Sequence, residues 1–308
     1  QEQLKIYRQA LLKHAFEGKL TAQWRKYNAD KLETSEQLLA RIQTERETRY
    51  QQQLDEWKQA VKDWEAKGKE GKNPRKPNKL NSFESTLDSE VQVLPTVPKN
   101  WCFTTLGEFI DQITAGKSFK CEEREPSNDE IGVAKVSAVT WGEYNETESK
   151  TCTDLAKINS DYFIETDDFI FSRANTIELV GACVIAKKVT KKIMLSDKTL
   201  RINFMNINKL YILHYLRSHF GRKEIMERST GNQESMRNIG QERIKSIVMP
   251  ICSLDEQQEI VNQLEEKLSI IEQNEKEIES ALAKAELLRQ SILKKVFSGQ
   301  PLSSKQSL

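Results

Sequence analysis

Apolar residues recur at helical spacing near the end of the chain. One set of apolar residues recurs every seven positions and consists of Leu264, Ile271, Ile278, Ala285 and Ile292. A second line, on the neighbouring side of the same helix, consists of Leu268, Leu282 and Val296. A heptad pattern sustained over about 40 residues predicts a coiled-coil helix roughly 50–60 Å long that begins near Asp255. Glu275 and Arg289 interrupt the second line. The predicted pairing is therefore imperfect, but this face still needs a partner.

The same pattern recurs at the beginning of the chain as an internal repeat. Residues 7–18 (YRQALLKHAFEG) match residues 288–299 (LRQSILKKVFSG), with identity at polar as well as apolar positions. Each copy ends in a glycine, Gly18 or Gly299, suited to the left-handed position that stops a helix. The polar identities disfavour the alternative of two unrelated amphipathic helices. Since the first copy aligns with the end of a longer helix, we expect it to lack an upstream part.

A second amphipathic helix is predicted from about Ser35 to Lys67. Its apolar stripe, at spacings of three and four, contains Tyr50, Leu54, Trp57, Val61 and Trp64. This stripe needs a partner surface. The following residues 67–79 are rich in lysine, glycine and proline, which is typical of a linker, and residues 81–93 are polar.

From about Val97 the pattern changes to short apolar runs separated by turn residues. The predicted strands are Trp101–Thr105, Ile131–Val139, Asp168–Ser172, Val180–Lys187 and Leu200–Phe204, and a helix is predicted over Asn208–Phe220. These elements indicate a mixed α/β domain of about 150 residues beside the long helices.

Composition agrees with long solvated helices next to a modest core, since 37% of the 308 residues are apolar and 30% are charged. No apolar run approaches the ~20 residues that cross a bilayer. The cysteines are odd in number, widely spread and never in a C-x-x-C pair. They indicate neither a disulfide framework nor a zinc ribbon, so we expect a cytoplasmic protein without a membrane partner.

The net charge of +1 conceals two opposed segments of the middle domain. Residues 96–186 contain eight Lys or Arg against sixteen Asp or Glu, whereas residues 187–250 contain fourteen against five. A basic surface attracts phosphate backbones, so this polarity suggests a nucleic-acid partner. The alternative is an ordinary solvated surface around residues 187–192.

Motifs for catalysis are missing from the sequence. Gly116-Lys-Ser resembles the end of a phosphate-binding loop, but Asp111 stands where that motif requires glycine. There is no G-x-G-x-x-G and no Asn-Pro-Pro-aromatic motif, and the three histidines are scattered: His14, His214 and His219. We therefore predict no catalytic residue and no metal site in this chain, with chemistry supplied by partners.

Several segments together resemble type I restriction-modification specificity subunits. They are the repeated Arg-Gln-x-x-Leu-Lys-x-x-Phe-x-Gly block, Lys19-Leu-Thr-Ala-Gln-Trp-Arg25, Val97-Pro-Lys-Asn-Trp101, Leu106-Gly-Glu-Phe109 and residues 250–261 (PICSLDEQQEIV). The resemblance covers nearly the whole chain and is to the second half of such a subunit. Two departures are Ile251-Cys-Ser-Leu in place of Pro-Pro-Leu, and the presence of a single recognition domain.

The resemblance implies a fold and a set of partners. Two helical regions pair as an antiparallel coiled coil, separate two target-recognition domains that read double-stranded DNA, and bind methyltransferase subunits, with restriction subunits in the full complex. The implied divisions are a central helical region 1–80, linker 81–95, recognition domain 96–250, distal helix 251–302 and tail 303–308. S-adenosylmethionine is expected on the methyltransferase, and no cofactor is expected on this chain. The expected subunit-interface residues are Leu12, Phe16, Leu264, Ile271, Ile278, Ile292 and Phe297.

Polar loops of the middle domain carry the predicted DNA contacts, because Arg, Lys, Asn and Gln can reach base edges. The predicted base contacts are Lys117, Lys120, Arg173, Asn175, Asn232, Gln233 and Arg237. The predicted phosphate contacts are Lys187, Lys188, Lys191 and Lys192. For each, the alternative is an ordinary surface position.

Two further hypotheses remain open at this point. The chain could be a coiled-coil assembly protein whose mixed domain binds another protein, in which case its association would be insensitive to salt. Two copies could also pair through their helices to recreate a pseudo-complete subunit that reads a symmetric site.

Overall fold

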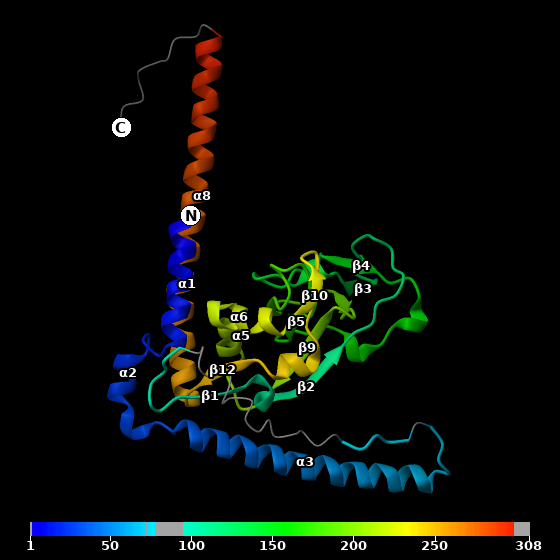
Figure 1. The fold of residues 1–308 in the computed structure, drawn as a ribbon. Coiled ribbons are helices and arrows are strands. Elements are labelled where there is room, and N and C mark those ends of the chain that lie inside the picture. Colours follow the sequence, from blue (N-terminus) through cyan, green and yellow to red (C-terminus); the bar gives the residue numbers. More distant parts are fainter. Residues whose placement is uncertain (1, 72, 78–94, 299–308) are drawn as a thin grey trace.

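Long helices surround a mixed α/β domain on two sides (Figure 1). The computed structural model describes residues 2–71, 73–77 and 95–298; the predicted tail 303–308 and most of the linker 81–95 lie outside this range. The helical elements outside the domain are α1 (Glu2–Phe16), α2 (Ala22–Tyr27), η1 (Ala29–Lys31), α3 (Ser35–Ala66) and α8 (Leu254–Phe297). The expected fold class is confirmed: a mixed α/β domain with long helices, two of which pair antiparallel.

Helix α1 lies antiparallel against the first half of α8 (Figure 1). Leu12 and Phe16 of α1 are buried together with Leu264 and Ile271 of α8, and an ion pair of 2.8 Å joins Arg8 to Glu275. Gly18 follows α1 with a φ of +69°, which confirms the predicted left-handed stop. The second half of α8 extends beyond the start of α1.

The domain contains four small sheets. A four-stranded antiparallel sheet has the order β2 (Ile110–Ala115), β9 (Thr199–Phe204), β5 (Phe169–Ser172) and β7 (Cys183–Ile185). A three-stranded mixed sheet consists of β4 (Ser149–Thr151), β3 (Ile131–Ala134) and β8 (Lys192–Met194).

The two other sheets are antiparallel. One has the order β10 (Thr230–Gln233), β11 (Met236–Asn238) and β6 (Ala174–Asn175), and the other pairs β1 (Cys102–Thr105) with β12 (Val248–Ile251). The β1–β12 pair joins the first and last strands of the domain, so the chain enters and leaves at one place. The helical segments of the domain are η3 (Leu106–Phe109), η4 (Val136–Ala138), η5 (Leu155–Lys157), η6 (Ser160–Tyr162), α5 (Lys209–Arg217), α6 (His219–Arg228) and α7 (Gln241–Lys245).

Three predicted elements differ from the observed ones. The predicted helix over residues 208–220 is two helices, because Ser218 ends α5 and its hydroxyl accepts a hydrogen bond from the Gly221 amide to begin α6. The predicted strand 180–187 begins only at Cys183, since Gly181 turns the chain with a φ of +81°. The predicted strand 131–139 stops at Ala134, where the chain forms the 3-10 turn η4.

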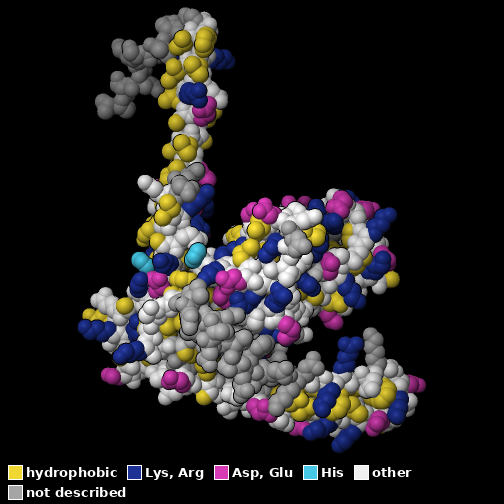
Figure 2. Space-filling model, in the orientation of Figure 1, with side chains coloured by type: hydrophobic (Ala, Val, Ile, Leu, Met, Phe, Trp, Pro, Cys, Tyr) yellow, Lys and Arg dark blue, Asp and Glu magenta, His cyan; other side chains and the backbone are white. Residues whose placement is uncertain are grey.

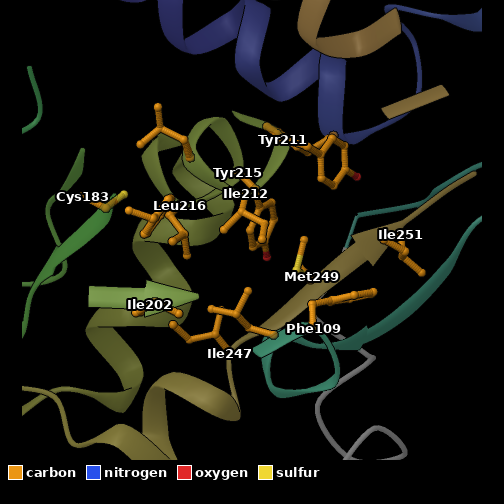
Figure 3. Close-up of a cluster of buried hydrophobic side chains, with 14 of the residues drawn as sticks. Phe109, Cys183, Ile202, Tyr211, Ile212, Tyr215, Leu216, Ile247, Met249 and Ile251 are labelled. Atoms are coloured by element: carbon orange, nitrogen blue, oxygen red, sulfur yellow. The ribbon is translucent and has the colours of Figure 1, made fainter. Parts of the chain in front are cut away.

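One hydrophobic core connects the domain to the helices (Figure 3). The ring of Phe16 packs edge-on against Tyr211 and Tyr215 of α5, with centroids 5.2 Å away in each case. The two tyrosine hydroxyls donate hydrogen bonds to the carbonyls of Pro250 and Val248 in β12, at 3.0 and 2.5 Å. Because α5 packs against both the coiled coil and the β1–β12 pair, the orientation of the domain on the helices is fixed.

A buried carboxylate strengthens the same junction. Glu256, in the first turn of α8, is fully buried. It accepts hydrogen bonds from the Thr21 hydroxyl at 2.9 Å, Arg25 Nε at 2.7 Å and Trp101 Nε1 at 2.9 Å. Three segments that are distant in sequence therefore meet at one side chain.

Candidate nucleic-acid interface

Four polar loops of the domain lie side by side, and we call them the loop surface. They are Gly116–Lys120, Ser172–Thr176, Ser196–Lys198 and Thr230–Asn238. Gly116 approaches Leu195 so closely that a Cβ would lie 1.9 Å from the Leu195 carbonyl oxygen, and the Ser118 hydroxyl donates a hydrogen bond to Asp197. The first loop is thereby fixed beside the third.

The remaining contacts join the third loop to the second and the second to the fourth. The Arg173 amide donates to the Lys198 carbonyl at 2.9 Å, and the Ile239 amide donates to the Arg173 carbonyl at 2.9 Å. Strand β6 pairs with β11 so that Asn175 lies opposite Arg237. Segments separated by more than a hundred residues in sequence thus form one continuous surface.

The predicted base-contact residues lie on this surface. Their side chains differ in how far they are exposed to solvent and in whether they already form hydrogen bonds within the domain. Lys117, Lys120 and Gln233 are exposed, and Arg173 is half-buried. The Arg237 guanidinium hydrogen-bonds the Gly231 carbonyl at 2.7 Å and the Ser229 hydroxyl at 2.9 Å, so it holds the β10–β11 hairpin.

Asn175 also has a local role in the loop surface. Its side-chain oxygen accepts from the Thr176 amide at 2.9 Å, and its amide group donates to the Ser172 hydroxyl at 3.3 Å. The side chain of Asn232 lies outside the described part of the chain. Lys198 is exposed on the third loop and was not among the predicted residues, because one lysine in a short turn carries no distinctive sequence signal.

The predicted phosphate-contact lysines lie elsewhere on the domain. Backbone hydrogen bonds between Ala186 and residues 167 and 168 place Lys187 at the amino-terminal end of β5, whereas the loop surface lies at its carboxyl end. The structure therefore does not bring Lys187, Lys188, Lys191 and Lys192 together with the other candidates.

Acidic residues from the preceding segment face these lysines. Lys191 pairs with Glu125, and Lys187 lies 3.8 Å from Glu143. Burial raises the pKa of Glu146, but hydrogen bonds from Thr190 and Lys191 outweigh it, so that the pKa is lowered overall. Two of the four lysines thus pair with acidic residues of the preceding segment, and Figure 2 shows basic and acidic side chains interspersed on the domain.

A groove of about 600 Å³ separates the domain from the helices. Trp141 lies on its domain side, where its indole donates to the Glu178 carbonyl at 2.8 Å and the Arg222 guanidinium lies 4.5 Å above the ring. Within the groove, His214 of α5 and Glu265 of α8 are 2.7 Å apart. The groove wall is therefore held by polar contacts between the domain and the coiled coil.

The expected subunit-interface residues divide into two groups. Leu12, Phe16, Leu264 and Ile271 are buried by other helices of the same chain, and Ile278 is half-buried. Ile292 and Phe297 are 41% and 86% exposed. They belong to an exposed apolar face of α8 visible in Figure 2, which we call the distal face: Leu282, Leu288, Ile292, Leu293, Val296 and Phe297.

The family model described as type I restriction modification DNA specificity domain matches residues 98–281. This match spans the mixed domain and the first part of α8, which is more than half of the chain. The chain belongs to this specificity family. The expected resemblance is thereby confirmed.

Specificity subunits of characterised enzymes are similar to this member of the family. The EcoEI specificity subunit of Escherichia coli is 28% identical over 188 residues, which are 60% of this chain and 32% of that protein. The EcoKI specificity subunit of Escherichia coli K12 is 28% identical over 185 residues, with coverages of 57% and 39%. The matches thus span well under half the length of these relatives.

Solved structures of specificity subunits also align with the chain. A chain from a type I R-M system covers 89% of this one and 59% of its own length, with 16% identity and a TM-score of 0.48. The HsdS subunit from Thermoanaerobacter tengcongensis covers 87% and 57%, with 18% identity and a TM-score of 0.41.

Neither a metal site nor a membrane-spanning helix is found in the described part of the chain. Across residues 2–71, 73–77 and 95–298, no three His, Cys, Asp or Glu side chains gather as a set of metal ligands. In the same part of the chain, no helix combines the length and apolar character needed to span a bilayer.

Proposed function

We propose that the mixed domain reads one half of a bipartite DNA site for a type I restriction-modification complex. The observation that carries the proposal is the convergence of four loops into one surface with Lys117, Lys120, Arg173 and Lys198 on it. Exposed basic and amide side chains on a rigid scaffold are suited to base edges and phosphates. Membership in the DNA specificity family supports the same assignment.

Different residues are assigned different roles. Lys117, Lys120, Arg173 and Gln233 are assigned to base contacts. Arg237 and Asn175 are assigned to positioning, because their polar groups already hold the loops. Lys187, Lys188 and Lys192 remain candidates for phosphate contacts at the other end of the domain.

We further propose that this chain performs no chemistry itself and that the distal face binds the methyltransferase subunit. The distal face continues the apolar seam that α1 covers on the first half of α8, so a helical partner can extend the same packing. The methyltransferase would supply S-adenosylmethionine and methylate adenine, and restriction subunits would join the full complex.

A second copy of the chain is the other candidate for the distal face. Two copies that pair through these faces would present two recognition domains and read a symmetric site. Sedimentation of the isolated chain distinguishes the two cases, because self-association gives a dimer in the absence of the methyltransferase.

Selection from a degenerate duplex library, with the methyltransferase subunit present, tests the DNA proposal. We expect one short sequence to be enriched, and Arg173→Ala to reduce that enrichment by about tenfold, as loss of a good base contact does. Lys26→Ala, at an exposed position on α2 outside the domain, is the control and should leave the enriched sequence unchanged. Equal binding of all sequences at physiological salt would overturn the proposal.

A further inference from the structure

Helix α3 is far longer than the core requires. Its first turns are part of the core, where Leu38 and Ile42 are fully buried. Farther along, Arg46 pairs with Glu108 at 2.6 Å and Arg49 pairs with Asp111 at 2.8 Å. These contacts attach the root of α3 to the domain and fix its direction. Beyond Arg49 the helix continues to Ala66 without a residue in the buried core.

The outer part of α3 is stiffened by the chain that follows it. The chain reverses direction at Gly68, where φ is +73°, and then runs back along the helix. Trp57 Nε1 donates to the Pro74 carbonyl at 3.0 Å, and the Lys76 ammonium lies 5.9 Å above the Trp57 ring. Residues 35–71 and 73–77 therefore form a two-layered projection, which we call the arm. In Figure 1 the arm runs beneath the domain and away from α8.

Charge is distributed unequally along the arm. Residues 35–56 contain three Lys or Arg against five Asp or Glu, whereas residues 57–77 contain seven against three. The side chains of Lys58, Lys62, Lys67, Lys69, Arg75 and Lys76 are exposed. The inner part of the arm, residues 35–56, thus has a net negative charge, and the outer part, residues 57–77, has a net positive charge.

A hollow separates the arm from the underside of the domain. Its volume is about 1090 Å³, and it is lined by Arg49, Trp57 and Arg75 of the arm and by Asp111 and Lys245 of the domain. Figure 2 shows Lys and Arg side chains of the arm projecting toward the domain across this hollow. Of the exposed basic residues named above, Arg75 lines the hollow, and the other five lie outside it and face solvent around the arm.

We propose that the basic end of the arm binds the phosphate backbone of the duplex that flanks the half-site. This inference rests on the proposed function, because it places the duplex against the recognition domain. From Arg49 to Ala66 the helix extends about 25 Å, which corresponds to about seven base pairs of duplex. Lysines on a stiff support lose little additional freedom on binding, and their contact with phosphates is independent of base sequence.

The test compares variants of the full chain in complex with the methyltransferase subunit. The arm variant is Lys62→Gln with Lys67→Gln, and the control is Lys26→Gln with Lys31→Gln, which removes the same charge from exposed positions on α2 and η1. The first probe is a 40-base-pair duplex of random sequence. For the arm variant we expect about tenfold weaker binding and a salt slope reduced by about one to two, since each phosphate contact contributes about 0.9.

A second probe separates flanking contacts from base reading. It is a 15-base-pair duplex with the library-selected half-site at the end nearest the arm, so that no duplex flanks the half-site on that side. The arm variant should bind this duplex as the wild-type chain does, and charge reversal to Lys62→Glu with Lys67→Glu should enlarge only the effect on the long duplex. Unchanged affinity and salt slope on the long duplex would overturn the proposal, as would an equal loss on both duplexes.

Two outcomes distinguish this proposal from related ones. If the arm variant loses the methyltransferase subunit in gel filtration while DNA affinity is unchanged, the arm binds protein and the proposal is wrong. If the wild-type complex enriches no sequence from the library, the proposed function fails. The random-sequence duplex still reports on the arm in that case.

Discussion

Arg25 Nε lies 2.7 Å from Glu256 Oε1, at the point where the first helical region, the recognition domain and α8 meet. The carboxylate is fully buried and also accepts from Thr21 and Trp101. Removing one partner of a buried ion pair leaves the other charge uncompensated, which costs about 3–5 kcal/mol. We expect Glu256→Ala to lower the free energy of unfolding by about that amount, measured by urea denaturation.

The control for this prediction is Glu266→Ala, because Glu266 lies on the same helix and is exposed. Its effect should stay within about 0.5 kcal/mol. Similar losses in the two variants would contradict a special role for Glu256.

The internal repeat provides a matched pair for a second prediction. Phe16 is fully buried against Tyr211 and Tyr215, whereas its repeat counterpart Phe297 is 86% exposed. Phe16→Ala should lower the free energy of unfolding by about 3–5 kcal/mol, because it removes a ring from a packed core. Phe297→Ala in the isolated chain should change it by less than about 0.5 kcal/mol. Urea denaturation measures both variants. Equal losses in the free energy of unfolding would contradict different roles for the two copies of the repeat.

Acid should weaken the contact between the domain and the coiled coil. The hydrogen bond with His214 lowers the pKa of Glu265, and burial partly opposes this effect. Since the folded pKa lies below the unfolded value of about 4.3, the carboxylate stabilises the fold above that pH. This stabilisation is lost as the pH falls through the folded pKa.

The measurement is urea unfolding of the wild-type chain and of Glu265→Gln between pH 3 and 6. The advantage of the wild-type chain should shrink toward pH 3. Glu266→Gln should differ from the wild-type chain by the same small amount at every pH. A constant difference for Glu265→Gln would show that ionisation of the Glu265 carboxyl does not stabilise the fold.

The distal face predicts a separation between stability and assembly. Ile292→Asp should weaken association with the methyltransferase subunit by at least tenfold, because it places a charge in an apolar contact. The melting temperature of the isolated chain should not change, since Ile292 is already exposed. Lys276→Asp, at an exposed position on the side of α8 opposite Ile292, is the control. Titration calorimetry measures the affinity of each variant for the methyltransferase subunit. If Ile292→Asp binds as tightly as the wild-type chain, the methyltransferase binds another surface.

The sequence by itself determined the long helices outside the domain and the family. Heptad spacing predicted α8, the stripe from Tyr50 to Trp64 predicted α3, and the glycine after Phe16 predicted the end of α1. These features depend on residues within a few turns of one another, so local periodicity is sufficient. The strands β2, β4, β6, β8, β10, β11 and β12 were not predicted. All except β2 have two to four residues, so they carry no periodic signal and depend on distant partners.

Only the tertiary structure decided which polar residues act together. Regional charge suggested one basic surface at residues 187–192, but the fold pairs Lys187 and Lys191 with acidic residues from an earlier segment. The fold also brings Lys198 beside Arg173 and uses Arg237 to hold a hairpin. Charge pairing and loop adjacency are relations across the fold, so spacing along the chain cannot specify them. Local patterns thus determined the long helices and the family, whereas long-range contacts determined the loop surface.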